Sequence, residues 1–151
     1  MLILEKLILK YHRFRFFLLY PSIKRSTYSI YGDFNIIDPS NFIFDIGLSL
    51  NHGCYINASG KIVVGKNVSI SAGAKLISTS LDVKNGLSAD HYFEEINIGS
   101  NVQVGAGAII LPGVKIPDNV VIGAGSVVTK DIDISGVYVG SPASLLRQFD
   151  E

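Results

Sequence analysis

The chain has 151 residues, with 13 basic and 13 acidic side chains and a single cysteine, Cys54. Its length suits one domain with a buried core. The balanced charge gives no sign of a nucleic-acid partner. One cysteine excludes an intramolecular disulfide, as expected of a cytoplasmic protein. Fifteen glycines and no tryptophan are typical of a chain with many tight corners, and we expect an all-β protein.

Residues 1–21 form the first predicted element. Leu4, Leu7, Ile8 and Tyr11 have helical spacing. Basic residues are interspersed among them: Lys6, Lys10, Arg13 and Arg15. These charges interrupt the apolar run too early for a transmembrane helix. Two interpretations stay open, a helical cap over the first coil of the domain or a basic amphipathic segment in peripheral contact with a membrane.

Residues 30–78 consist of short apolar runs separated by Gly, Asn, Asp and Ser, which predicts irregular first coils of a repeat fold. The step of eight residues from Ile56 to Val64 predicts a corner enlarged by two residues near Ser59 and Gly60. Cys54 falls at an inward position and is predicted to belong to the core.

Residues 79–97 are polar and match no repeat, so we expect an inserted loop there. Repeat proteins place such insertions on one face, often the binding face. This segment is therefore the candidate active-site loop.

Residues 98–132 carry the clearest pattern: an aliphatic residue recurs every six positions, and the residue four positions after each one is small or aliphatic. The recurring residues are Ile98, Val104, Ile110, Ile116, Ile122 and Val128. Neither a helix nor a flat strand explains a strict period of six, whereas a coil built from short flat faces does. We predict regular coils with these side chains inward and with Gly or Asn at corners that need a positive φ. Residues 133–151 leave the repeat as a C-terminal tail, either a short helix or an extended segment.

Several segments of this repeat resemble the hexapeptide-repeat acyltransferases, most closely their sugar and polysaccharide O-acetyltransferase branch. They are Ile98-Gly99-Ser100-Asn101-Val102, Val104-Gly105-Ala106-Gly107-Ala108, Ile110-Leu111-Pro112-Gly113-Val114, Ile122-Gly123-Ala124-Gly125-Ser126-Val127-Val128-Thr129-Lys130-Asp131 and Gly140-Ser141-Pro142-Ala143. The likeness covers about residues 46–147. It implies a left-handed parallel β-helix, a homotrimer, and acetyl-CoA bound in a groove between neighbouring subunits.

The resemblance also implies which residues bind the acetyl donor. Ala106 and Ala124 match positions along the CoA groove, where backbone groups beside small side chains can bond the pantetheine amides. Thr129 and Lys130 match a pair near the nucleotide end, where a cation suits phosphate. Arg147 matches a C-terminal arginine of similar role.

Transfer to a hydroxyl requires a general base, for which an imidazole is suited. In the resembling sugar acetyltransferases a histidine aligns with Leu81, so the base must lie elsewhere. His12 is far from the coils, and His52 sits in an expected corner. His91 lies just before the regular coils restart, where related acyltransferases place their base, and we predict that His91 has this role.

Asp82 or Asp90 is expected to orient the His91 imidazole, and Asn57 and Asn51 are candidates for contact with the acceptor. The predicted function is acetyl transfer from acetyl-CoA to a sugar hydroxyl in surface-polysaccharide assembly, that is, of capsule, O-antigen or exopolysaccharide. An N-acetyltransferase acting on an amino sugar and a catalytically inactive β-helix scaffold remain as alternatives. No metal is expected, because the three histidines are too scattered for the zinc site of the related carbonic anhydrases.

Overall fold

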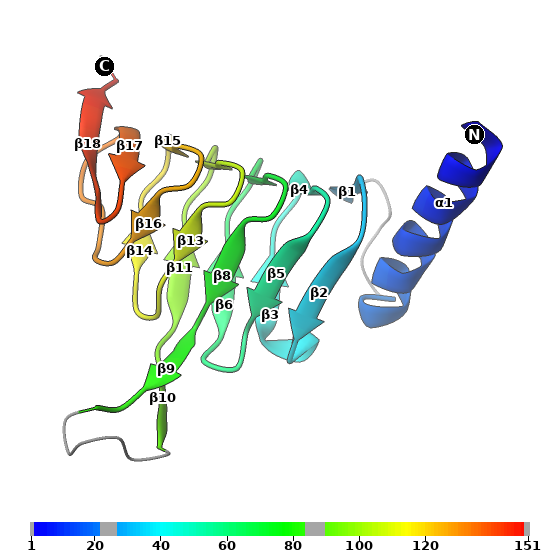
Figure 1. Ribbon diagram of the computed structural model, residues 1–151, viewed down its shortest axis with the longest axis horizontal. Helices are drawn as coiled ribbons and strands as arrows, with labels where there is room; N and C mark the ends of the chain where they lie inside the picture. Colours follow the sequence, from blue (N-terminus) through cyan, green and yellow to red (C-terminus); the bar gives the residue numbers. More distant parts are fainter. Residues whose placement is uncertain (1, 22–26, 84–89, 150–151) are drawn as a thin grey trace.

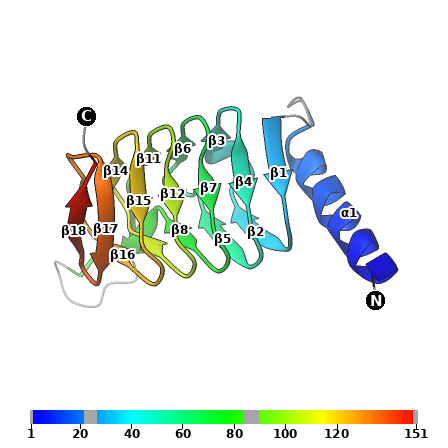
Figure 2. The same ribbon diagram turned by 90° about the horizontal axis from the view of Figure 1, so that it is seen from above.

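The computed structural model describes residues 2–21, 27–83 and 90–149. Its body is a parallel β-solenoid of about five turns, in which each turn adds one short strand to each of three sheets (Figures 1 and 2). The predicted all-β repeat fold, with a helical N-terminal segment and an inserted loop, is confirmed.

The sheets are called A, B and C in the order in which the chain visits them. Sheet A contains β1 (Tyr28–Ile30), β4 (Leu48–Leu50), β7 (Ser69–Ile70), β12 (Gln103–Val104), β15 (Val120–Ile122), β17 (Gly136–Gly140) and β18 (Ala143–Gln148). Sheet B contains β2 (Phe34–Ile37), β5 (Cys54–Asn57), β8 (Lys75–Ile77), β13 (Ile109–Ile110) and β16 (Val127–Val128). Sheet C contains β3 (Phe42–Phe44), β6 (Ile62–Val64), β11 (Ile96–Ile98) and β14 (Lys115–Ile116).

The recurring aliphatic residues form the core, as predicted. Val104 pairs with Ile122 in sheet A, and Ile110 pairs with Val128 in sheet B, so residues eighteen positions apart stack in the regular coils. All six recurring residues are buried. Cys54 is also buried, which raises the pKa of its thiol to about 11.

The first coils, predicted to be irregular, have turns of constant length, and this length differs from that of the regular coils. Tyr28 pairs with Leu48 and Tyr55 with Lys75, so each of these turns takes twenty residues. The additional residues lie in the corner between sheets B and C. In the first turn that corner contains the 3-10 helix η2 (Pro39–Asn41), and in the second turn it spans residues 58–61.

Asn and Gly occupy the tight corners, as predicted. At the corner from sheet C to sheet A, Asn67, Asn101 and Asn119 have φ values of 55°, 57° and 60°. Their side chains form a ladder, with Asn67 donating to Asn101 at 3.2 Å and Asn101 donating to Asn119 at 3.1 Å. Asparagine tolerates this left-handed conformation, so the corner residues also bind neighbouring turns together.

Helix α1 (Leu2–Leu19) closes the open end of the first coil with its C-terminal half. Phe16 is fully buried, with ring-centroid distances of 4.8, 4.6, 5.5 and 5.7 Å to Tyr20, Tyr28, Phe34 and Phe44. The Tyr20 hydroxyl donates to the Pro39 carbonyl at 2.9 Å. The N-terminal half of α1 leans away from the solenoid (Figure 1). Within the described ranges, no helix combines the length and apolar character needed to cross a bilayer.

The other end of the solenoid is closed by the tail. Strand β17 continues sheet A, and β18 folds back antiparallel onto it (Figure 2). The described part of the tail is therefore extended rather than helical.

Candidate functional site

The inserted loop leaves the solenoid as an antiparallel hairpin of β9 (Thr79–Leu81) and β10 (His91–Phe93), which projects from the corner between sheets B and C (Figure 1). Ser78 is buried at its base, where its hydroxyl donates to the Asn57 carbonyl at 2.7 Å and accepts the Gly60 N–H at 2.8 Å. The Glu94 N–H donates to the Ser78 carbonyl at 3.0 Å. The hairpin thus leaves and rejoins the coil at one fixed point.

His91 lies directly opposite Leu81 in this hairpin. Opposed residues of an antiparallel pair point to the same face, so the predicted base is beside the position where the resembling enzymes carry their histidine. Asp82 and Asp90 come next, with the Asp82 N–H donating to the Asp90 carbonyl at 2.9 Å. The structure therefore brings the three predicted catalytic residues together. Residues 84–89 of the predicted loop lie outside the described residues.

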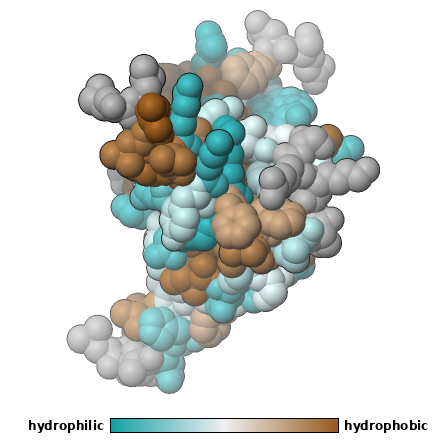
Figure 3. Space-filling model, turned by 90° about the vertical axis from the view of Figure 1, so that its right-hand side faces the viewer, coloured by the Kyte–Doolittle hydropathy of each residue, from teal (hydrophilic) through white to brown (hydrophobic). Residues whose placement is uncertain are grey.

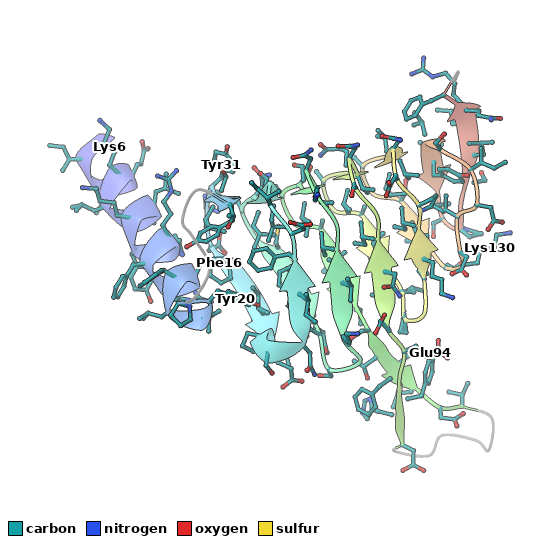
Figure 4. The ribbon with its side chains drawn as sticks, turned by 180° about the vertical axis from the view of Figure 1, so that it is seen from behind. Lys6, Phe16, Tyr20, Tyr31, Glu94 and Lys130 are labelled. Atoms are coloured by element: carbon teal, nitrogen blue, oxygen red, sulfur yellow. The ribbon has the colours of Figure 1, made fainter. Side chains whose placement is uncertain are left out.

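Two hollows follow the same corner and share Glu94. The first, of about 560 Å³, is lined by Ser80, Leu81, Asp82, Val83, Tyr92 and Glu94. The second, of about 500 Å³, includes Glu94, Pro112, Gly113, Thr129 and Lys130 in its lining. Glu94 and Lys130 lie on the same side of the solenoid (Figure 4). We call the hairpin together with Glu94, Thr129 and Lys130 the hairpin edge.

Small residues line the corner between sheets A and B, on the other side of sheet B. Ala72, Ala106 and Ala124 are exposed at successive turns of this corner. Gly107 and Gly125, with φ values of 66° and 68°, follow the last two, and nothing lies within 4 Å of where their Cβ atoms would be. Glycine suits this conformation, and the result is an open strip of backbone and methyl groups. We call Ala72, Ala106 and Ala124 the alanine edge.

A histidine paired with a carboxylate lies in line with the alanine edge, in the first turns. His52 occupies a corner, as the sequence predicted, but its pairing with Asp33 was not predicted. The His52 imidazole is paired through Nδ1 with the Asp33 carboxylate, and both side chains are exposed. This hydrogen bond lowers the pKa of Asp33 below its ordinary value. With the proton on Nδ1, the Nε2 atom is left to accept another proton. The pair was missed because Asp33 and His52 belong to different turns.

The two edges lie on opposite sides of sheet B, so one chain does not bring all the predicted site residues together. Asn51 lies on the side of the alanine edge, and Asn57 lies at the base of the hairpin. Arg147 is on β18, opposite Val137 and close to the Phe149 ring, at 6.0 Å from its centroid. In the described part of the chain, no group of three or more His, Cys, Asp or Glu residues is arranged to hold a metal ion.

Sequence comparison identifies relatives of this chain. The profile of the bacterial transferase hexapeptide family (six repeats) matches residues 95–130. A candidate acetyltransferase of Schizosaccharomyces pombe is 40% identical over 102 residues, which are 66% of this chain and 49% of that protein. The galactoside O-acetyltransferase of Escherichia coli K12 is 34% identical over 129 residues, 85% of this chain and 61% of that protein. The chain thus spans about half to three fifths of the length of these two relatives.

Structural comparison gives the same relationship over nearly the whole chain. The solved structure of a galactoside acetyltransferase in complex with coenzyme A superimposes with a TM-score of 0.73 and 30% sequence identity, and the match covers 97% of this chain and 81% of that one. The shared sequence extends beyond the repeats that fix the fold. The chain therefore belongs to the hexapeptide-repeat acetyltransferase family, in its sugar O-acetyltransferase branch.

Proposed function

We propose that this protein is an O-acetyltransferase that moves the acetyl group of acetyl-CoA to a sugar hydroxyl. The observation that carries the proposal is the match to a CoA-bound galactoside acetyltransferase over 97% of the chain. An acceptor that belongs to a surface polysaccharide is part of the proposal and follows from the resemblance to the polysaccharide branch.

Acetyl-CoA would be bound by both edges of sheet B. The open alanine edge offers backbone groups to the pantetheine arm at Ala106 and Ala124. Thr129 and Lys130 of the hairpin edge, together with Arg147 from β18 of sheet A, would hold the phosphates of the nucleotide end. Because one chain holds the two edges apart, a complete groove needs the hairpin edge of one subunit against the alanine edge of another. A homotrimer, the assembly implied by the family resemblance, provides such a groove three times.

The chemistry requires one imidazole at the acceptor. The sugar hydroxyl attacks the thioester carbonyl carbon as the imidazole accepts its proton, and the C–S bond then breaks. The imidazolium returns the proton to the departing thiolate, so the products are the acetyl ester and CoA. His91 is our proposed base, with Asp82 or Asp90 orienting it, because it lies opposite Leu81 in a hairpin beside one hollow of the hairpin edge.

His52 is a second candidate for the base, favoured by its pairing with Asp33. It lies on the alanine edge, so in the proposed groove it would face the hairpin of the neighbouring subunit. Asn51, the residue before it, and Asn57 are our candidates for acceptor contacts.

Release of CoA thiol should be measured with acetyl-CoA and a panel of neutral sugars, oligosaccharides and amino sugars, with product masses determined. We expect acetyl-dependent thiol release and a product whose ester bond is cleaved by mild alkali. An alkali-stable product formed only from amino sugars would instead identify an N-acetyltransferase. Acetyl-CoA binding without turnover on any acceptor would favour the inactive scaffold.

The variants His91→Ala and His52→Ala then identify the base in the same assay. Loss of a general base lowers the rate by about 100-fold or more, and we expect this of His91→Ala with an unchanged oligomeric state. His52→Ala serves as the matched variant on the other edge. The opposite outcome, with His91→Ala near normal and His52→Ala inactive, would assign the base to the His52–Asp33 pair.

A further inference from the structure

Helix α1 exposes an apolar face that the solenoid does not cover. Leu4, Leu7, Tyr11, Phe14 and Leu18 recur at intervals of three and four residues and are all exposed, with Leu4 63% and Leu18 59% accessible. Ile3, Ile8 and Leu19 are also exposed and widen this face. Apolar side chains at intervals of three or four align on one side of a helix. Since Phe16 and Tyr20 anchor the helix to the solenoid, this side faces solvent.

The charges of α1 flank the apolar face and are nearly all positive. Glu5 is the one acidic residue of the helix, against Lys6, Lys10, Arg13 and Arg15. Arg13 and Arg15 donate to the carbonyls of Ile30 and Phe34, at 3.2 and 2.7 Å, and so help to fix the helix on the first coil. Lys6 and Lys10 are exposed. Seen from this end of the molecule, brown apolar side chains lie among teal hydrophilic ones (Figure 3).

A hollow next to the apolar face is suited to an anionic headgroup. It lies between α1 and β1, has a volume of about 630 Å³, and is lined by Lys10, Arg13, Phe14, Tyr28, Ser29 and Ile30. In this hollow, the cationic side chains of Lys10 and Arg13 therefore lie beside aromatic and aliphatic ones, next to the apolar face of α1. This combination matches a phosphate group attached to an acyl chain.

We propose that α1 docks the protein on an anionic lipid surface, with the helix lying in the plane of the interface. The 18-residue helix is about 27 Å long at 1.5 Å per residue, which is long enough to lie along the headgroup layer. The charges favour lipid over a second copy of the helix, because each α1 offers only Glu5 as an acidic partner against four basic residues, Lys6, Lys10, Arg13 and Arg15. Anionic headgroups supply the missing negative charge.

The test is co-sedimentation of the full chain with phosphatidylcholine vesicles, with and without phosphatidylglycerol. We expect binding to the anionic vesicles, lost in Leu7→Asn/Phe14→Asn and weakened roughly 10-fold or more in Lys6→Gln/Lys10→Gln. The matched control is Leu146→Asn, which removes a 67% exposed leucine at the other end of the solenoid and should bind as the wild type does. Circular dichroism checks that each variant is folded.

Three results would overturn the proposal. They are absence of wild-type binding to the anionic vesicles, wild-type binding by the Leu7/Phe14 variant, and a Leu146→Asn defect as large as that of the helix variant. Sedimentation velocity distinguishes the competing explanation. If the Leu7/Phe14 variant forms a smaller oligomer than the wild-type protein, and the wild-type protein does not bind vesicles, then α1 is an interface between copies.

Discussion

Residues 98–132 and the hairpin of β9 and β10 belong to one solenoid but bury their side chains differently. In the coils, buried and outward residues alternate along each strand, and Ile110 and Ile122 are fully buried. In the hairpin, His91, Tyr92 and Phe93 are all exposed. The coils are thus held by packing inside one chain, whereas the hairpin leaves the side chains of β10 exposed. Substitutions in the coils should affect folding, and substitutions in the hairpin should affect turnover.

The largest expected effect is in the coils. Ile110→Ala removes a fully buried side chain from β13, which is paired on both sides in sheet B, and should lower the free energy of unfolding by about 3 kcal/mol. Urea denaturation measures this value. Ile109→Ala, the neighbouring outward position, is the matched control and should cost less than about 1 kcal/mol. Equal losses at both positions would contradict the alternation of burial.

The hairpin can be tested by moving the imidazole across it. Because Leu81 and His91 are opposed, the variant His91→Ala/Leu81→His places an imidazole on the same face of the hairpin. We expect the kcat of this double variant to be at least about 10-fold higher than that of His91→Ala, since a correctly placed base contributes about 10²-fold or more. Thermal unfolding should be unchanged in both variants. Full activity of the single variant, or no recovery in the double one, would show that the hairpin does not carry the base.

Lys130 belongs to the proposed site for acetyl-CoA and lies just after β16 of the regular coils, at the hairpin edge. Lys130→Ala should raise the KM for acetyl-CoA about 5-fold, as expected for an exposed ionic contact of about 1 kcal/mol, and leave kcat nearly unchanged. Steady-state kinetics with varied acetyl-CoA measures both constants. Lys66→Ala, at the corner between sheets C and A, is the control and should behave as the wild type does.

The smallest effect concerns the pair formed by Asp33 and His52. The pKa of Asp33 is lowered in the folded protein by this hydrogen bond. A carboxyl whose folded pKa is lowered stabilises the protein above its unfolded pKa of about 4, and this contribution is lost as the pH falls through the lowered value. In His52→Ala the pKa should return toward normal. A carbon-detected NMR titration measures it, and an Asp33 pKa that does not respond to the substitution would show that the pairing is absent in solution.

The sequence predicted most of the fold because each repeat is local. The inward positions of Ile98, Val104 and Ile110 follow from the six-residue period, since every face has the same length. The Asn and Gly corners follow from the few residues that tolerate a positive φ. The first coils were harder to predict because their twenty-residue turns place the additional residues at one corner, which interrupts the six-residue pattern.

The site was predicted only in part. The sequence singled out His91, Asp82 and Asp90, and the structure brings them into one hairpin, but their roles remain proposals. Glu94 was missed because its position between two hollows depends on how the hairpin rejoins the coil. The His52–Asp33 pair was missed because it depends on how two neighbouring turns stack, which brings together residues nineteen positions apart.

By itself, the sequence determined the coil, its inward rows, its tight corners and the family to which the chain belongs, because these depend on residue type and short spacing. The tertiary structure decided which side chains meet. It set His91 across from Leu81, His52 against Asp33, and the alanine edge on the other side of sheet B from the hairpin edge. These relations depend on strand pairing and on the length of each turn, which no local pattern encodes.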